Sequence, residues 1–324
     1  MNTNMVNEIL PIKSYSEILE DNTSPPPHII GNGILLEKSL LMIVGQKKSF
    51  KSYLAFNMMT ALSAGKSFSG FEIEQPCSVM LLSAEGGYYP NRDRLQMMLK
   101  RFESEELANG FINFASRLNL EVDDHFHALR RTIDEYKPRV LILDPLSKFH
   151  FCDENSASQV GQIMSQLRML IEDYDLSIIL VHHAGKDVSR GARGSSVLSA
   201  EYDSCISISK ADATTIKLSF DMRHVETPDN RYISFNSETL TFESTDSSSD
   251  PVFEYIENNG NVSQTELIKY WVQNDTYSQS HAYRMVKKSV SHGLVKSDDG
   301  YLYIEGMNPL TDKEKEKEKQ NNDK

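Results

Sequence analysis

Residues 39–52 read Ser-Leu-Leu-Met-Ile-Val-Gly-Gln-Lys-Lys-Ser-Phe-Lys-Ser, and the helix-forming run Tyr-Leu-Ala-Phe-Asn follows them. A buried strand therefore leads through a polar loop into a helix. This order predicts a phosphate-binding loop, because the free N–H groups at a helix N-terminus attract anions. Lys51 is placed to reach the β- and γ-phosphates of ATP, and the Ser52 hydroxyl to hold Mg²⁺. The residues predicted to surround the nucleotide are Gly45, Gln46, Lys47, Lys48, Ser49, Phe50, Lys51, Ser52 and Tyr53.

Position 50 departs from the phosphate-loop pattern G-x-x-x-x-G-K-[ST], because Phe50 stands where the second glycine is expected. A bulky side chain here predicts a negative or merely tolerated φ angle and a slightly wider loop. The segment alone leaves a second interpretation open, in which it is a polar turn before a buried helix.

Two other apolar runs end in carboxylates. Val-Leu-Ile-Leu-Asp144 has the pattern of a Walker B strand, and we expect Asp144 to hold Mg²⁺, partly through water. Val-Met-Leu-Leu-Ser-Ala-Glu85 precedes two glycines, and a glutamate there can orient and deprotonate an attacking water. The alternatives are a helix cap for Asp144 and an ion pair from Glu85 to Arg92 or Arg94.

A further apolar run, Ser-Ile-Ile-Leu-Val, ends in His182 and His183. Either histidine can donate a hydrogen bond to a γ-phosphate and so sense its hydrolysis. The pair lacks cysteine or carboxylate neighbours at metal-ligand spacing, which disfavours a zinc site. Parallel strands bring their carboxyl ends to one edge, where open α/β sheets bind ligands. Four strands ending in phosphate, metal, base and sensor groups therefore predict one site.

The order of elements indicates the fold class. Continuous apolar runs alternate with helical patterns, which predicts an α/β fold with a mostly parallel, twisted sheet flanked by helices on both faces. The predicted strands of this sheet are 39–44, 78–83, 139–143, 177–181 and 204–208, and the helices are 52–64, 92–102, 125–136 and 158–174. Two later strands, 215–220 and 231–235, are expected to pair antiparallel at the far edge.

These motifs together resemble the RecA-like ATPases of the RepA type, which include plasmid hexameric replicative helicases. The segments that carry the resemblance are 45–52, 83–85, 141–146, 181–186 and 193–198, and it covers about residues 25–242. It implies a RecA-like fold, ATP hydrolysis with Mg²⁺, and a ring such as a hexamer, with nucleotide at the subunit interfaces. It also implies Glu85 as the catalytic base, Asp144 as the Walker B acid, and His182 or His183 as the sensor.

Rings of this type complete each site with a basic residue from the neighbouring subunit. Arg223 lies where related ATPases carry a Lys-x-Arg pair, although Asp221 replaces the first basic residue. Arg193 is the competing candidate, and either arginine can instead be an ordinary surface residue. The Gly- and Arg-rich loop 186–196 can contact a DNA backbone in the ring channel or be simply a mobile basic loop.

The C-terminal region predicts a helix, a helix-turn-helix and a β-hairpin, which resembles a winged helix. Its third helix carries Arg284, Lys287 and Lys288 with no acidic residue between 278 and 292, which favours DNA phosphate contacts. Protein contact or simple packing of the helix is the alternative. The predicted divisions are an extended arm (1–33), the ATPase domain (34–242), a linker (243–250), the winged-helix-like domain (251–306) and a disordered charged tail (307–324).

Composition limits the partners. The net charge of −12 over 324 residues excludes general coating of nucleic acid or anionic membrane, so DNA contact must come from a local patch. Three widely spaced cysteines fit a reducing cytosol and exclude a disulfide scaffold. The first residues lack a signal pattern and no apolar run approaches the roughly 18 residues of a membrane span. We therefore expect a soluble, cytoplasmic protein without membrane contact.

Three functions compete at this point. The first is a DNA-dependent ATPase motor, a helicase or replication ATPase that translocates on single strands as a homo-oligomer. The second is a nucleotide-switched DNA-binding regulator or loader with slow turnover, which Phe50 and Asp221 favour. The third, a small-molecule kinase, lacks a recognisable lid or acceptor site.

Overall fold

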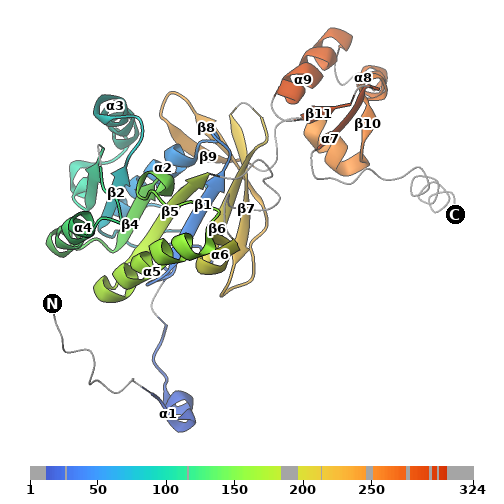
Figure 1. The fold of residues 1–324 in the computed structure, drawn as a ribbon. Helices are drawn as coiled ribbons and strands as arrows, with labels where there is room; N and C mark the ends of the chain where they lie inside the picture. Colours follow the sequence, from blue (N-terminus) through green and yellow to red (C-terminus); the bar gives the residue numbers. More distant parts are fainter. Residues whose placement is uncertain are drawn as a thin grey trace.

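The protein is described here by a computed structural model (Figure 1). The structure describes residues 12–25, 28–114, 117–183, 196–212, 214–245, 251–274, 278–291, 294–297 and 299–304. These form a large α/β unit up to residue 245 and a small C-terminal unit from residue 251, each with its own hydrophobic core. No helix in these ranges is long and apolar enough to cross a membrane.

Nine strands of the described chain form one sheet in the order β3-β2-β4-β5-β1-β6-β7-β8-β9. The strands β1 to β6 pair in parallel, and β7, β8 and β9 continue the sheet antiparallel. This confirms the predicted α/β class and the antiparallel far edge. The bounds are β1 Leu40–Gly45, β2 Val79–Ser83, β3 Gly110–Asn113, β4 Val140–Asp144, β5 Ser177–His183, β6 Ser204–Lys210, β7 Thr215–Met222, β8 Arg231–Asn236 and β9 Thr241–Thr245.

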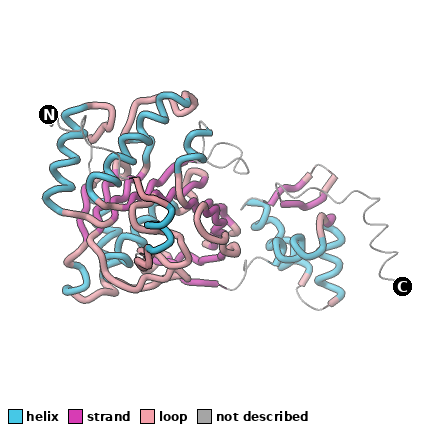
Figure 2. Tube along the Cα trace, turned by 90° about the horizontal axis from the view of Figure 1, so that it is seen from below, coloured by secondary structure: helices cyan, strands magenta, loops and turns pink. Residues whose placement is uncertain are grey.

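Helices cover both faces of the sheet, and Figure 2 shows the strands running between them. Leu54 of α2 and Met98 of α3 pack on one face, whereas Leu129 of α4, Leu167 of α5 and Leu198 of α6 pack on the other. Strands buried on both faces explain the continuous apolar runs in the sequence. The helical bounds are α2 Lys51–Ala64, α3 Tyr88–Leu99, α4 Asp123–Tyr136, α5 Ala157–Tyr174 and α6 Ser196–Glu201, with 3₁₀ turns η1 Ser104–Leu107 and η2 Leu146–Lys148.

The N-terminal boundary differs from the prediction of an extended arm over residues 1–33. Residues Tyr15–Glu20 form helix α1, because Ser14 and Glu17 make a reciprocal capping box that satisfies free N–H groups. Ile29 and Ile30 are buried in the main core, and Ile30 pairs with Leu35. The domain core therefore begins before residue 34, while residues 1–11 lie outside the described chain.

The predicted end of the large domain at residue 242 also differs from the structure. Strand β9 continues through Thr245 and pairs with β8, so residues 243–245 belong to the sheet and not to the predicted linker. The polar side chains of this strand form no apolar run, so the sequence pattern does not indicate it, because an edge strand faces solvent along one side. Residues 246–250 and the predicted tail lie outside the described ranges.

The C-terminal unit combines three helices with a small antiparallel sheet in the order β10-β12-β11. Ser263 and Glu266 form the expected capping box, and the expected hairpin is confirmed by the pairing of β11 with β12. Its core includes Ile256, Trp271 and Leu302. The bounds are α7 Pro251–Asn259, β10 Val262–Ser263, α8 Gln264–Gln273, α9 Gln279–Ser291, β11 Leu294–Lys296 and β12 Tyr301–Ile304.

Candidate phosphate and metal site

The strand ends that carry the predicted site meet at one edge of the sheet. Gly45 at the end of β1 stands opposite His183 of β5, and Ser83 of β2 stands opposite Asp144 of β4. β1 lies between β5 and β6, and the connections that leave β1 (to β2) and its neighbour β5 (to β6) run in opposite directions across the sheet. Ligands of open α/β sheets bind at such a reversal.

Two residues of the loop have a left-handed backbone. Lys48 has φ 61° and Phe50 has φ 66°, both left-handed, whereas Ser49 between them is not left-handed and Lys51 begins α2. Alternating hands turn successive N–H groups into one concavity, which is a nest for an anion. The expectation of a negative φ at Phe50 is therefore wrong. Phe50 adopts the conformation that the missing glycine would take.

Packing explains how a phenylalanine tolerates this backbone. A left-handed conformation costs about 1–2 kcal/mol for a residue with a Cβ. The Phe50 ring lies 4.7 Å from that of Phe235 and 6.3 Å from that of Phe242, centroid to centroid. Such aromatic pairs contribute roughly 0.5–1.5 kcal/mol each beyond burial. The aromatic contacts therefore offset the backbone cost.

Gly45, by contrast, has no substitute. A Cβ there would lie 2.6 Å from Ser49 Oγ and 2.9 Å from the carbonyl oxygen of Ile208. The loop closes tightly over the end of β1, so this position requires glycine.

Lys51 lies inside the loop that precedes it. Its Nζ donates to the carbonyl oxygens of Gly45 at 2.9 Å and Gln46 at 2.6 Å. Burial lowers the pKa of Lys51 to about 8, and the nearby carboxylates of Asp144 and Glu85 oppose this effect. A buried ammonium that donates to uncharged carbonyl oxygens is a strong attractor for phosphate oxygens.

Ser52 and Asp144 come together across the sheet edge. Ser52 Oγ donates to Asp144 Oδ1 at 3.1 Å, and Asp144 is 2% exposed. Burial raises the pKa of Asp144 to about 6, the hydrogen bond from Ser52 opposes the shift, and Glu85 adds to it. A hydroxyl and a buried carboxylate supply the hard oxygen ligands that Mg²⁺ prefers. The donor set therefore fits the predicted ion.

Glu85 stands near both groups but is half-exposed. Its Oε1 lies 3.9 Å from Lys148 Nζ, in the turn after β4. The alternative partners are engaged elsewhere, since Arg92 contacts Asp93 at 2.6 Å and Arg94 donates to Asn91 at 3.1 Å. The Glu85 carboxylate thus faces the site without a tight ion pair in the described structure.

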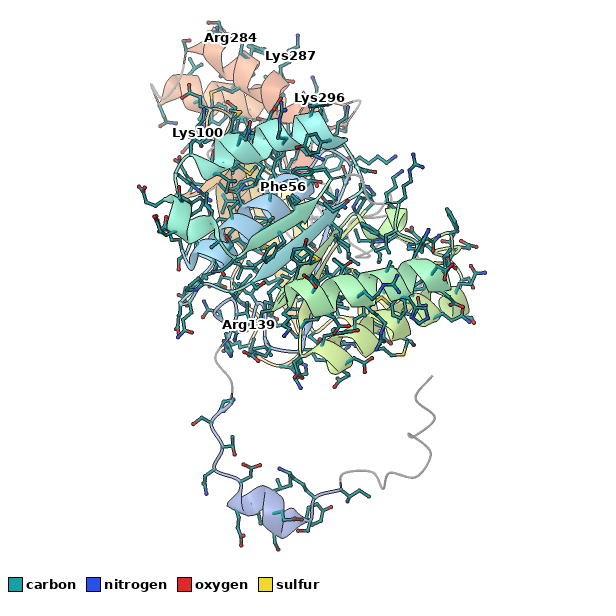
Figure 3. The ribbon with its side chains drawn as sticks, turned by 90° about the vertical axis from the view of Figure 1, so that its left-hand side faces the viewer. Phe56, Lys100, Arg139, Arg284, Lys287 and Lys296 are labelled. Carbon is teal, nitrogen blue, oxygen red and sulfur yellow. The ribbon has the colours of Figure 1, made fainter. Side chains whose placement is uncertain are left out.

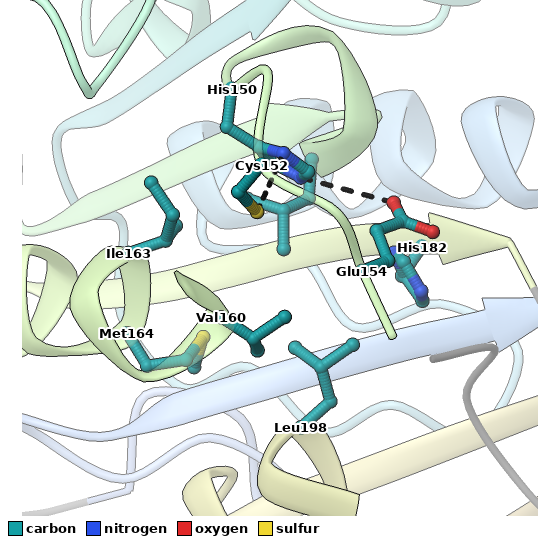
Figure 4. Close-up of a pocket in the computed structure, with 9 residues that line it drawn as sticks. His150, Cys152, Glu154, Val160, Ile163, Met164, His182 and Leu198 are labelled. Carbon is teal, nitrogen blue, oxygen red and sulfur yellow. Dashed lines mark hydrogen bonds and ion pairs between the residues drawn. The ribbon is translucent and has the colours of Figure 1, made fainter. Parts of the chain in front are cut away.

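The two histidines point to opposite faces of the sheet, because side chains alternate along a strand. His183 pairs in register with Gly45 at the start of the phosphate loop, and burial together with the nearby Lys51 ammonium lowers the pKa of His183. His182 is buried and lines a small cavity with His150 and Cys152, whose Nδ1 and Sγ atoms lie 3.1 Å apart (Figure 4). His183 is therefore the histidine that the fold brings to the loop.

Some predicted residues are not brought to this edge. Met222 pairs with Ser204 at the start of β6, so Arg223 lies at the opposite edge of the sheet, where it donates to the carbonyl of Ala200. It cannot reach the loop of its own chain. Arg193 lies outside the described residues. The other predicted loop residues do lie at this edge: Gln46, Lys47 and Lys48 are exposed on the loop, and Tyr53 is half-buried at the start of α2.

No group of three or more His, Cys, Asp or Glu side chains in the described ranges is arranged to hold a metal. Mg²⁺ is commonly bound through one or two protein oxygens, with phosphate and water completing its shell, so the Ser52–Asp144 pair is compatible with this ion.

Comparison with known families agrees with this geometry. The model of a family described as AAA domain matches residues 8–189 of this chain. The chain belongs to the AAA domain family. The matched range includes the phosphate loop, Glu85, Asp144 and His183, and it ends before β6.

A solved structure supports the fold of this AAA domain protein. The structure is described as an ATPase domain, and it superposes with a TM-score of 0.53 at 14% sequence identity, covering 71% of this chain and 96% of that chain. The likeness confirms a RecA-like α/β fold, a mostly parallel sheet flanked by helices.

Asp144 makes the stability of the ligand-free protein depend on pH. The folded-state pKa of about 6 exceeds the unfolded value near 4, so the folded state binds the extra proton between these values. Stability is then lost as pH rises through 6, by roughly 3 kcal/mol for about two pKa units. Replacing Asp144 by asparagine should therefore stabilise the protein at pH 8 but much less at pH 4.

Urea unfolding without Mg²⁺ or nucleotide, at both pH values, measures this difference between wild type and D144N. D229N, which removes an exposed carboxylate from the loop between β7 and β8, controls for the loss of one charge. A stability difference that is the same at both pH values would contradict the burial of a charged Asp144.

Proposed function

We propose that this chain binds and hydrolyses ATP with Mg²⁺ and uses the energy to act on DNA, as a RecA-like motor of the RepA type. One observation carries the proposal. Lys51, the Ser52–Asp144 pair, Glu85 and His183 come from four parallel strands or their following turns and share one sheet edge. If the loop were only a polar turn before a helix, Asp144, Glu85 and His183 would have no reason to gather beside it.

The chemistry assigned to each residue follows from its position. The triphosphate lies against the N–H groups of the nest, and Lys51 exchanges two carbonyl oxygens for phosphate oxygens. Mg²⁺, held by Ser52 and Asp144, would neutralise charge on the phosphates. Glu85 accepts a proton from water as a new O–P bond forms at the γ-phosphorus and the bond to the bridging oxygen breaks. The products are ADP and inorganic phosphate.

His183 is assigned as the sensor. The lowered pKa keeps the His183 imidazole neutral. One ring nitrogen can therefore donate a hydrogen bond to the γ-phosphate without placing a second positive charge beside Lys51. Loss of the γ-phosphate removes that hydrogen bond at the end of β5. The end of β5 can then report hydrolysis to the residues that follow it.

The position of Arg223 bears on assembly. It is exposed at the sheet edge away from the phosphate loop of its own chain, so a catalytic role requires the site of a second copy. A homo-oligomeric ring, a hexamer by resemblance, supplies this arrangement, with Arg193 as the alternative finger. A positive charge delivered by a neighbour is worth about 10³–10⁵ in rate.

The C-terminal unit is proposed as a winged helix that contacts DNA. α8 and α9 form the helix pair and β11–β12 the wing. Arg284 and Lys287 are exposed on α9, and Figure 3 labels both on this helix at the top of the view. The side chain of Lys288 lies outside the described structure. Phosphate contacts of this kind give affinity that falls steeply with salt.

The motor is tested by ATP hydrolysis with and without single-stranded DNA, together with unwinding of a forked duplex. A motor hydrolyses ATP faster on DNA and separates the strands. Hydrolysis that DNA leaves unchanged, with no strand separation, would support the alternative of a nucleotide-switched regulator or loader. Absence of any nucleotide binding would overturn both.

The double variant R284E/K287E should bind DNA about tenfold or more weakly at moderate salt, because two phosphate contacts become repulsive. The slope of log affinity against log salt should fall by about two. K269E, a charge reversal at an exposed residue of α8, is the matched control. Equal DNA affinity in the double variant and the wild type would contradict DNA contact through α9.

A further inference from the structure

The left-handed backbone at Phe50 depends on residues far along the chain. A glycine adopts this conformation without steric penalty, but a residue with a Cβ does so only where its surroundings hold it. The surroundings of Phe50 are aromatic side chains from β8 and β9, more than 180 residues later in the sequence. The nest that faces the phosphates therefore depends on long-range packing.

The contacts form a compact cluster. The Phe50 ring lies 4.7 Å from Phe235 on β8, and Phe235 in turn lies 5.3 Å from Phe242 on β9 and 4.8 Å from Tyr53 on α2. The ammonium of Lys210, at the end of β6, lies 5.5 Å from the Phe50 centroid. These contacts together limit the movement of the Phe50 ring.

A second contact ties the same hairpin to the helix that begins at the loop. Asn57 of α2 is fully buried, and its Nδ2 donates to the carbonyl oxygen of Leu240 at 3.0 Å. Leu240 lies in the turn between β8 and β9 and has φ 57°. The hairpin thus contacts both the loop and the helix, so it fixes the angle between them.

We infer that Phe50 is a positioning residue for the phosphate site, and that the hairpin β8–β9 holds the loop in its nest conformation through the Phe50 ring. The inference rests on the proposed nucleotide site. In this chain, aromatic packing holds the left-handed backbone that glycine can adopt without steric penalty in the usual motif. Nucleotide affinity should therefore depend on Phe235, a residue with no role in phosphate contact.

Titration calorimetry of Mg²⁺–ADP with the full-length protein provides the test. Phe50→Ala keeps the Cβ and loses the ring, so it should bind about tenfold more weakly than wild type, the ratio that corresponds to the cost of a left-handed backbone. Phe50→Gly loses the ring but adopts the left-handed backbone without steric penalty. It should bind about tenfold more tightly than Phe50→Ala. If glycine restores ADP affinity although it lacks the ring, the ring acts by positioning the backbone and not by its own packing.

A second comparison uses Phe235. Phe235→Ala should weaken ADP binding several-fold in the wild-type background, and should have no further effect in the Phe50→Gly background. A general loss of stability would appear in both backgrounds, so thermal unfolding of all variants accompanies the titrations. Tyr232→Ala, on the same strand but the opposite face, is the matched control.

Two outcomes would overturn the inference: Phe50→Ala binding as wild type does, or Phe235→Ala weakening binding equally in both backgrounds. Lys51→Ala in the same titration separates this result from the proposed function. If Lys51→Ala loses binding while Phe50→Ala keeps it, only the role of Phe50 fails. If Lys51→Ala also binds normally, the nucleotide site itself is misplaced.

Discussion

Lys51→Ala is expected to reduce the rate of ATP hydrolysis at least about 10³-fold, because the variant lacks the preorganised positive charge that stabilises charge developing on the transferred phosphoryl group. The Lys51 ammonium lies within 3 Å of two loop carbonyl oxygens and is buried. No other buried lysine of the described chain lies in this loop, because Lys47 and Lys48 are exposed. Release of phosphate at saturating ATP measures the rate, and the ADP titration measures binding.

The fold should survive this change. Alanine removes a charge whose burial is itself unfavourable, as the lowered pKa of Lys51 indicates. The melting temperature should therefore not fall by more than a few degrees. Lys66→Ala, at an exposed lysine just after α2, controls for loss of one positive charge. Wild-type hydrolysis by K51A would rule out the phosphate-loop assignment.

The parallel strands could be predicted because burial on both faces leaves a continuous apolar run, with errors of a residue or two at the ends. β3 was missed since it has only four residues, none fully buried. The sequence alone also could not decide whether His182 or His183 faces the phosphate loop. Side chains alternate along β5, so a one-residue error in register exchanges their faces.

Phe50 shows the same limit more sharply. A glycine position in a loop motif specifies a backbone conformation, and the sequence shows only that the glycine is missing. Whether a phenylalanine can take its place depends on Phe235 and Phe242, and local patterns carry no information about contacts that distant. The replacement of the motif glycine by Phe50 was the one sign in the sequence, because an aromatic residue with a left-handed backbone requires packing partners.

Glu85→Gln is expected to slow hydrolysis by about 10²–10⁴-fold, the usual contribution of a positioned general base. Glutamine keeps the shape of the side chain but cannot accept the proton of the attacking water. Glu85 makes a long ion pair with Lys148 at 3.9 Å and is half-exposed, so the change should not disturb the fold. Glu172→Gln, at an exposed residue of α5, is the matched control.

The two active-site variants should differ in kind. Lys51→Ala removes a group that contacts the phosphates before and during reaction, so binding and turnover both fall. Glu85→Gln removes a group needed only when water attacks, so ATP affinity should stay within about threefold while turnover falls. Equal losses of binding and turnover in Glu85→Gln would make Glu85 a ligand-binding residue. Unchanged turnover would place the base elsewhere at this edge, and Asp144, with its pKa raised to about 6, would then be the carboxylate to test.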